Sequence, residues 1–110
     1  GYDPVSYFTV GKHVEGSDTF AAEWNAATWY FSSAENKAAF LAAPDKFAPQ
    51  YGGYCAFAMS YDSFAPTIPE AWSIVDGKLY LNFSLGVRGD WVSDQKEHIA
   101  NANENWAAKF

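Results

Sequence analysis

Alternation of apolar and polar positions, interrupted by turn residues, predicts two β-hairpins. Residues 19–33, TFAAEWNAATWYFSS, hold two aromatic runs on either side of Asn25-Ala26, and asparagine tolerates the left-handed backbone of a tight turn. Residues 72–84, WSIVDGKLYLNFS, centre on Asp76-Gly77, a strong signal for a two-residue turn. The inward-facing positions predicted for this second hairpin are Trp72, Ile74, Leu79, Leu81 and Phe83.

Two other segments have the pattern of helices. In residues 32–44, Ser32 and Glu35 have the spacing of a capping box, the alanines and leucine favour helix, and Pro44 ends it. We expect Phe40 and Leu41 to dock this helix on a sheet. A final helix is predicted from Ser93, which can cap it. Its apolar stripe is Ile99, Ala102, Trp106 and Phe110.

The remaining segments are shorter or less regular. Residues 5–10 alternate after the turn signal Asp3-Pro4 and predict a short strand or extended segment. Residues 45–71 are broken by prolines and glycines, so functional residues are expected there. The pattern as a whole predicts an α+β fold, with small antiparallel hairpins packed with two or more helices in a single domain, residues 1–110.

Composition narrows the classes of function. The net charge is −6 and no basic run occurs, which disfavours nucleic acid and anionic membrane surfaces as partners. No apolar run is long enough for a transmembrane helix. The chain has 5 Trp, 7 Tyr and 9 Phe, which indicate either an aromatic core or an aromatic-lined ligand groove.

The stretch YGGYCAFAMS, residues 51–60, contains the only cysteine and the only methionine. A single cysteine excludes an internal disulfide and a four-cysteine zinc site. Cys55 and Met59 are four positions apart, so they share a face in a helix or in a strand. Thiolate and thioether are soft donors that suit Cu(I). The alternatives are that both sulfurs fill the core, or that Cys55 is a redox or catalytic thiol.

Other side chains are candidates for the same site. His13, in an expected loop, and His98, in the last helix, could each complete a metal site, although an isolated histidine is more often a surface residue. Asp3 is a possible ligand or the residue that locks a turn through its side chain. Four tyrosines are candidates for lining a pocket near Cys55, namely Tyr2, Tyr7, Tyr51 and Tyr54.

Several of these segments together resemble one family. The stretches GYDPVSYF, TWYFSSAENKAAFLAAPDKFAPQYGGYCA, AWSIVDGKLYLNFS and IANANENW, in this order, resemble a YHS-domain protein of the small stand-alone bacterial type, similar to the TRASH group of metal-binding modules. The resemblance implies metal binding, with copper the first metal to test, and a periplasmic or secreted protein whose signal peptide has been removed. TRASH-type modules use several cysteines, and here only Cys55 is present. Any metal would therefore need mixed ligands or a second chain.

Our leading hypothesis is an exported metal-binding domain centred on Cys55, with Met59 and one histidine as further ligands. The alternative is a module that binds a small ligand or a protein through an aromatic groove. A thiol enzyme ranks third, because no motif of a known enzyme class is present.

Overall fold

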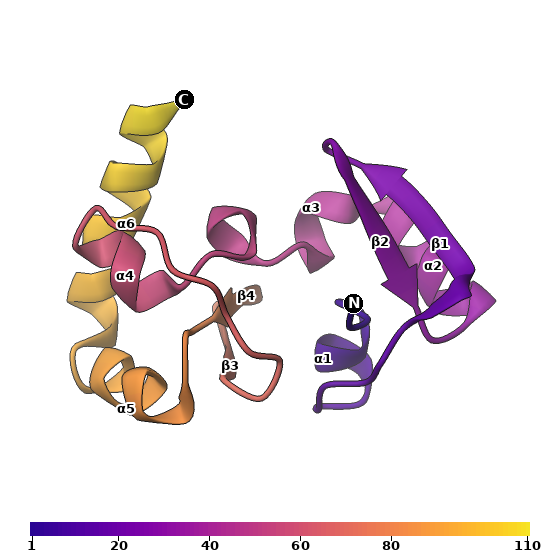
Figure 1. Ribbon diagram of the computed structural model, residues 1–110, viewed down its shortest axis with the longest axis horizontal. Helices are drawn as coiled ribbons and strands as arrows, with labels where there is room; N and C mark the ends of the chain where they lie inside the picture. Colours follow the sequence, from indigo (N-terminus) through magenta and orange to yellow (C-terminus); the bar gives the residue numbers. More distant parts are fainter. The chain divides into compact units, whose positions relative to one another are not determined.

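The protein has an α+β fold with two antiparallel hairpins, as the sequence predicts (Figure 1). The computed structural model describes residues 1–110, which divide into two compact units, Gly1–Ala48 and Pro49–Phe110. The first unit contains α1 (Ser6–Thr9), β1 (Ser17–Trp24), β2 (Ala27–Phe31), α2 (Ala34–Ala42) and α3 (Pro44–Phe47). The second contains the 3₁₀ turn η1 (Gln50–Gly53), α4 (Ala56–Ser60), β3 (Trp72–Val75), β4 (Lys78–Leu81), α5 (Leu85–Ser93) and α6 (Gln95–Lys109).

The beginning of the first unit is helical, so the predicted extended segment at residues 5–10 is wrong. The carboxylate of Asp3 accepts a hydrogen bond from the Val5 amide at 2.9 Å. Between them, the ring of Pro4 restricts its φ angle in the turn at residues 4–5. This local bond starts the helical turn α1, which places Val5 in the core. The alternation of apolar and polar residues alone predicted an extended segment, because it does not take account of the hydrogen bond between the Asp3 side chain and the Val5 amide, which favours a turn.

The first hairpin is confirmed. Strands β1 and β2 pair from Trp24 opposite Ala27 back to Ser17 opposite Phe31, with an irregularity between Ser17 and Ala21. Asn25 and Ala26 both have left-handed backbone angles, with φ of 52° and 63°, as a two-residue hairpin turn requires.

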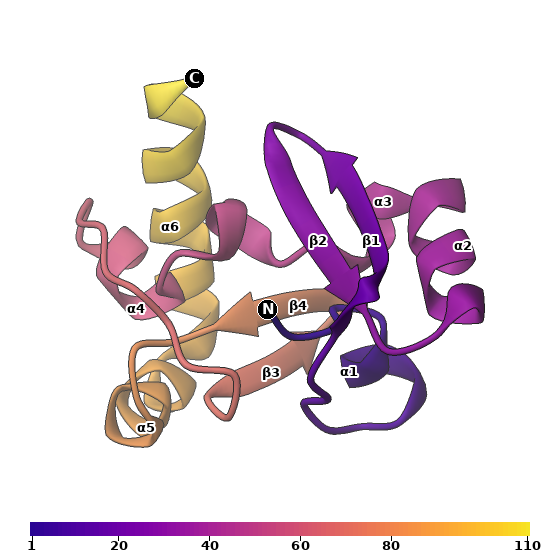
Figure 2. The ribbon, with the colours of Figure 1, turned by 45° about the vertical axis from the view of Figure 1, so that its right-hand side comes forward.

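Helix α2 covers this hairpin (Figure 2) and begins one residue later than predicted. Ser33, not Ser32, is the cap, because its hydroxyl accepts the Asn36 amide at 3.1 Å. Phe40 is fully buried as expected, whereas Leu41 is exposed, because only one of two successive helical positions can face the hairpin. The core of this unit is formed by Val5, Phe31, Phe40 and Phe47.

The second hairpin is also confirmed. Strands β3 and β4 pair from Val75 opposite Lys78 to Trp72 opposite Leu81, and Asp76 and Gly77 have positive φ angles. Leu79 is buried as predicted, but Phe83 is exposed because β4 ends at Leu81 and the alternation does not continue past it.

The end of the chain forms two helices where the sequence predicted one. Ser84 caps α5 through a hydrogen bond from the Val87 amide at 3.1 Å, so a helix begins nine residues before the predicted start at Ser93. Ser93 is the last residue of α5, and α6 begins at Gln95 without a side-chain cap. Of the predicted apolar stripe, Ala102 is buried and Phe110 is exposed.

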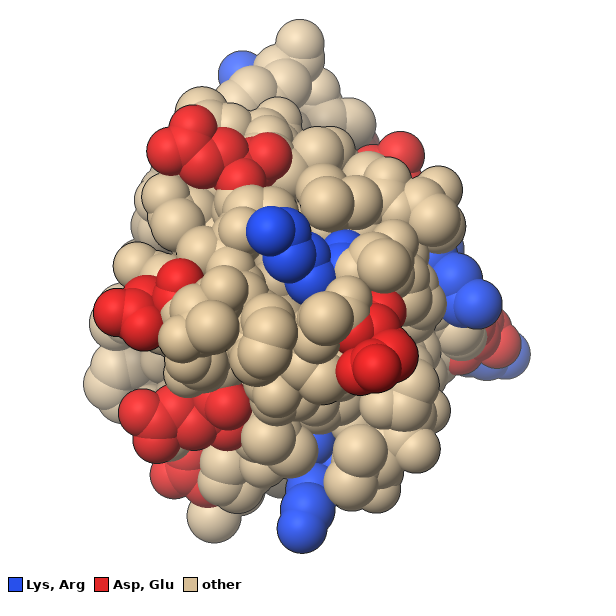
Figure 3. Space-filling model, turned by 90° about the vertical axis from the view of Figure 1, so that its right-hand side faces the viewer, with Lys and Arg blue, Asp and Glu red and all other residues tan.

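In the second unit α4 lies beside α6 (Figure 1) and also packs against α5, while η1 packs against β4, and the core lies among these elements. Its buried members are Tyr51, Ala56, Met59, Tyr80, Trp91 and Ala102. None of the helices combines the length and apolar character needed to cross a bilayer. On the face drawn in Figure 3, acidic and basic side chains are interspersed among uncharged ones.

Candidate functional site

Residues 51–53 turn the chain sharply before Cys55. Tyr51, Gly52 and Gly53 have φ angles of 58°, 61° and 84°, all left-handed. A Cβ atom at Gly52 would make a tight contact of 3.3 Å with the Trp106 ring, so both the backbone angle and this ring favour glycine. The two glycines therefore serve the geometry of the backbone.

Tyr51 is a structural residue. Its ring is buried and its hydroxyl donates to Asn103 Oδ1 at 2.8 Å. Burial, with a smaller contribution from the neighbouring Tyr80, raises the pKa of the Tyr51 hydroxyl well above its usual value. The hydroxyl therefore stays protonated and holds α6, and the ring is not available to line an open pocket.

Cys55 directly precedes the first residue of α4, so the structure has a helix where the sequence left helix and strand open. The residue is only 1% exposed. Its sulfur accepts the Phe83 amide at 3.2 Å and donates to Asn82 Oδ1 at 3.4 Å. Asn82 Oδ1 also accepts the Phe57 amide at 2.9 Å. These bonds connect the start of α4 to the residues that follow β4.

Asn82 has one unsatisfied group. Its side chain is fully buried, and its Nδ2 has no hydrogen-bond partner. The Phe57 amide must face an oxygen, so the orientation of the Asn82 amide is fixed and Nδ2 cannot exchange places with Oδ1. Sequence reasoning missed Asn82, because its role depends on the approach of residues 27 positions apart.

Met59 lies one helical turn after Cys55, and its amide donates to the Cys55 carbonyl at 3.0 Å. Its side chain is fully buried in the cluster that includes Tyr80 and Trp91. The two sulfur-containing side chains thus have different surroundings: polar groups at Cys55, and rings at Met59. This geometry is that of core residues.

His98 is buried, contrary to the surface position that is usual for an isolated histidine. Its Nδ1 lies 3.0 Å from Ser60 Oγ, and that hydroxyl also lies 2.5 Å from the Phe57 carbonyl. A carbonyl only accepts, so the Ser60 proton points to it, and His98 Nδ1 carries the proton shared with Ser60. The imidazole lies against the rings of Phe57 and Tyr61, with centroids at 5.0 and 5.9 Å.

Asp3 belongs to the first unit and has a turn-locking role. It is fully buried, and its Oδ2 accepts from the Ser32 amide, the Ser32 hydroxyl and Asn36 Nδ2 at 2.7–2.8 Å. Burial alone would raise the pKa of the Asp3 carboxyl, but the donors from Asn36, Ser32 and Val5 together outweigh it and the pKa is lowered. All of the bonds that hold the carboxylate come from its own unit.

The other predicted site residues of the first unit are His13, Tyr2 and Tyr7. His13 is in a loop, as predicted, and its ring makes an edge contact with the exposed Tyr2 at 5.6 Å between centroids. Tyr7 is buried on α1.

A metal centre has little support in this arrangement. Within residues 1–110, no group of three or more histidine, cysteine, aspartate and glutamate side chains is placed to hold a metal ion. The Cys55 sulfur is already engaged by Phe83 and Asn82, and His98 bonds Ser60. The donor set does not fit a copper ion in this geometry, and copper binding stays a prediction.

Tyr54 is the one predicted ligand-binding tyrosine of the second unit that is exposed, and it is part of a surface that we call the aromatic face: Tyr54, Phe64 and Trp106. Tyr54 and Phe64 meet edge to face with centroids 4.9 Å apart, and Trp106 is 6.5 Å from Tyr54. Tyr54 is 44% exposed and Phe64 is 53% exposed. Phe64 and Trp106 were not among the predicted site residues, although Phe64 stands in the proline-rich segment where function was expected.

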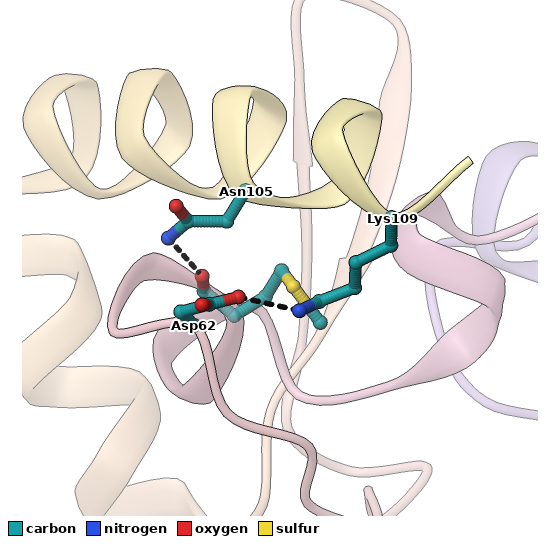
Figure 4. Close-up of polar contacts among 4 residues, drawn as sticks. Asp62, Asn105 and Lys109 are labelled. Carbon is teal, nitrogen blue, oxygen red and sulfur yellow. Dashed lines mark hydrogen bonds and ion pairs between the residues drawn. The ribbon is translucent and has the colours of Figure 1, made fainter.

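An ion pair borders this face. Lys109 Nζ lies 2.5 Å from Asp62 Oδ1 and 5.1 Å from the centre of the Phe64 ring. Figure 4 shows Lys109 and Asn105 reaching from α6 toward the end of α4, where Asn105 Nδ2 donates to the Met59 carbonyl at 2.8 Å. The Asn105 bond holds α6 against α4, and the Lys109 ammonium thereby lies beside the loop that carries Phe64.

No family model matches the chain, and neither the curated proteins nor the solved structures contain a match to it.

Proposed function

We propose that the unit Pro49–Phe110 is a protein-interaction module that binds a partner through the aromatic face. The observation that carries this proposal is the exposure of two rings in contact. Tyr54 is 44% exposed and Phe64 is 53% exposed, and the centroids of their rings are 4.9 Å apart. Aromatic side chains bury large areas when covered, and they are enriched at interfaces. A group of exposed rings on one surface is typical of an interaction site.

The face is also held in place before any partner arrives. The Tyr54 amide donates to the Tyr51 carbonyl at 3.0 Å, and the Thr67 hydroxyl donates to the Gly53 carbonyl at 2.9 Å. Gly52 lies beneath Trp106. A surface whose backbone is fixed loses less conformational freedom on binding, which favours affinity.

A macromolecule suits this face better than a small molecule. Small-molecule sites enclose most of the ligand surface in a concave, largely buried pocket. Here two of the three rings open to solvent, so a partner chain that spreads over them would bury more area than a compact ligand.

The test uses random dodecapeptides displayed on phage and selected on the full chain. We expect peptides whose binding shifts the NMR signals of Tyr54, Phe64 and Trp106, and whose affinity falls at least tenfold for Phe64→Ser. The control is Phe83→Ser, which removes an exposed phenylalanine elsewhere in the same unit. Peptides that bind both variants as well as the wild type, or no selected peptide at all, would refute the proposal.

Metal binding at Cys55 remains the rival proposal, and its support is the YHS resemblance together with the soft donors of Cys55 and Met59 at a spacing of four residues. Titration of Cu(I) into the wild type and Cys55→Ser tests it directly. Equal affinity for both proteins would exclude a Cys55-centred site.

A further inference from the structure

The aromatic face already holds a cation. The ammonium of Lys109 lies over the Phe64 ring at 5.1 Å and against the Asp62 carboxylate at 2.5 Å. The Lys109 side chain is only 24% exposed, less than an unrestrained lysine on a helix surface would be. A ring face and a carboxylate on one side are the two groups that bind an ammonium, the first through its quadrupole and the second through its charge.

The net charge of the second unit favours cations over anions as partners. The second unit contains seven acidic residues, Asp62, Glu70, Asp76, Asp90, Asp94, Glu97 and Glu104, against four basic ones, Lys78, Arg88, Lys96 and Lys109. Its net charge is therefore −3 (4 − 7), and the whole chain carries −6. A positively charged partner would be attracted and an acidic one repelled.

The contact made by Lys109 is easily exchanged. The Asp62 carboxylate is 61% exposed, so water and salt screen its side of the ion pair and the pair contributes little to stability. Another cation can therefore take the place of Lys109 at small cost. The Tyr54 ring, packed against Phe64, would then add a second aromatic surface beside the incoming group.

Resting on the proposed interaction function, we propose that Asp62 and Phe64 form a subsite for a lysine side chain of the partner, and that Lys109 occupies this subsite in the free protein. Lys109 then acts as an internal competitor. Its removal opens the subsite, whereas neutralising Asp62 weakens it.

The experiment is an NMR titration of the full chain with Nα-acetyl-lysine amide, and with Nα-acetyl-norleucine amide as the uncharged control. We expect Lys109→Met to bind the lysine probe about threefold more tightly than the wild type, with shifts at Phe64 and Tyr54. The double variant Lys109→Met/Asp62→Asn should lose this gain. The matched control is Lys96→Met, which removes the other lysine of α6 and should leave the affinity unchanged.

Three results would overturn the subsite: no shifts at Phe64 in Lys109→Met, equal binding of the norleucine probe, or the same gain in Lys96→Met. The phage selection separates this failure from failure of the interaction function. Selected peptides that need Phe64 but contain no lysine would refute the subsite and leave the interaction function standing.

Discussion

Asp3 and Asn36, which are 33 positions apart in the sequence, are joined by a 2.8 Å hydrogen bond from the Asn36 amide nitrogen to the Asp3 carboxylate. The same carboxylate oxygen accepts both donors of Ser32. One buried side chain therefore connects the start of the chain, the end of β2 and the first turn of α2.

Replacing Asp3 by asparagine should destabilise the protein. The amide nitrogen of asparagine cannot accept hydrogen bonds, so donors that now face Asp3 would be left unsatisfied in a buried site. We expect Asp3→Asn to lower the free energy of unfolding by about 3 kcal/mol, measured by urea denaturation. Asp18→Asn, which neutralises an exposed acid of the same unit, should change it by less than about 0.5 kcal/mol. Equal effects of the two substitutions would contradict the role of Asp3.

The same carboxylate makes stability depend on pH. Burial alone would raise the pKa of folded Asp3, but its hydrogen-bond donors outweigh burial and hold the pKa below its ordinary value of 3.8. A lowered pKa means that the stabilisation is complete above the unfolded pKa and is lost as the pH falls through the folded pKa. The difference in unfolding free energy between the wild type and Asp3→Asn should therefore be constant from pH 7 to about 5 and shrink below about pH 4. A difference that grows on acidification would have the wrong sign for this explanation.

Ala26 has a backbone conformation that favours glycine. Its φ of 63° is left-handed, where a Cβ atom costs energy that glycine avoids. We expect Ala26→Gly to raise the free energy of unfolding by about 0.5–1 kcal/mol. Ala27→Gly, one residue later in β2, is the matched control and should lower it, because glycine weakens a strand. Destabilisation by both changes would argue against the left-handed turn.

The hairpins could be predicted from sequence because their signals are local. Asn25-Ala26 and Asp76-Gly77 each form a two-residue turn. Such a turn sets the pairing of the two strands beside it, in which apolar and polar residues alternate. Helix α5 could not be found this way, since its sequence, LGVRGDWVS, contains two glycines that disfavour helix. It is held by the burial of Trp91 and by Arg88, whose Nε donates to the Trp72 carbonyl at 2.7 Å.

The candidate site was harder to predict than the hairpins, because its contacts join residues that are far apart in the sequence. The residue types at positions 55 and 59 pointed to a metal, but nothing in the sequence shows that residue 82 would bond the thiol. Nor does it show that Ser60 would bond His98 and hold it in a buried position. Tyr54 was identified as a candidate, whereas Phe64 joined it only through tertiary contact.

Gly89 offers a simple gain in stability. It lies within α5, is exposed, and a Cβ atom there would have no atom within 4 Å. Alanine has a higher helix propensity and restricts the unfolded chain, so Gly89→Ala should stabilise the protein by about 0.5–1 kcal/mol. Gly77→Ala is the contrasting variant: its surroundings are equally open, but its φ is 75°, so we expect destabilisation. Thermal unfolding of both variants would check the opposite signs.

Cys55 should react with thiol reagents only when the second unit opens. Its side chain is 1% exposed, and its sulfur is bonded to Phe83 and Asn82. Alkylation requires a free thiolate that the reagent can reach, so the rate is limited by the fraction of molecules in which this region is unfolded. We expect alkylation by iodoacetamide at pH 7.5, followed by mass spectrometry, to be at least about a hundredfold slower in buffer than in 6 M urea.

Asn82→Ala, which removes one of the two bonds to the sulfur, should speed the reaction in buffer, whereas Asn101→Ala, an exposed position on α6, should not. Fast alkylation of the folded wild type would instead favour the thiol-enzyme hypothesis, because it would mean that the native structure presents a reactive thiolate.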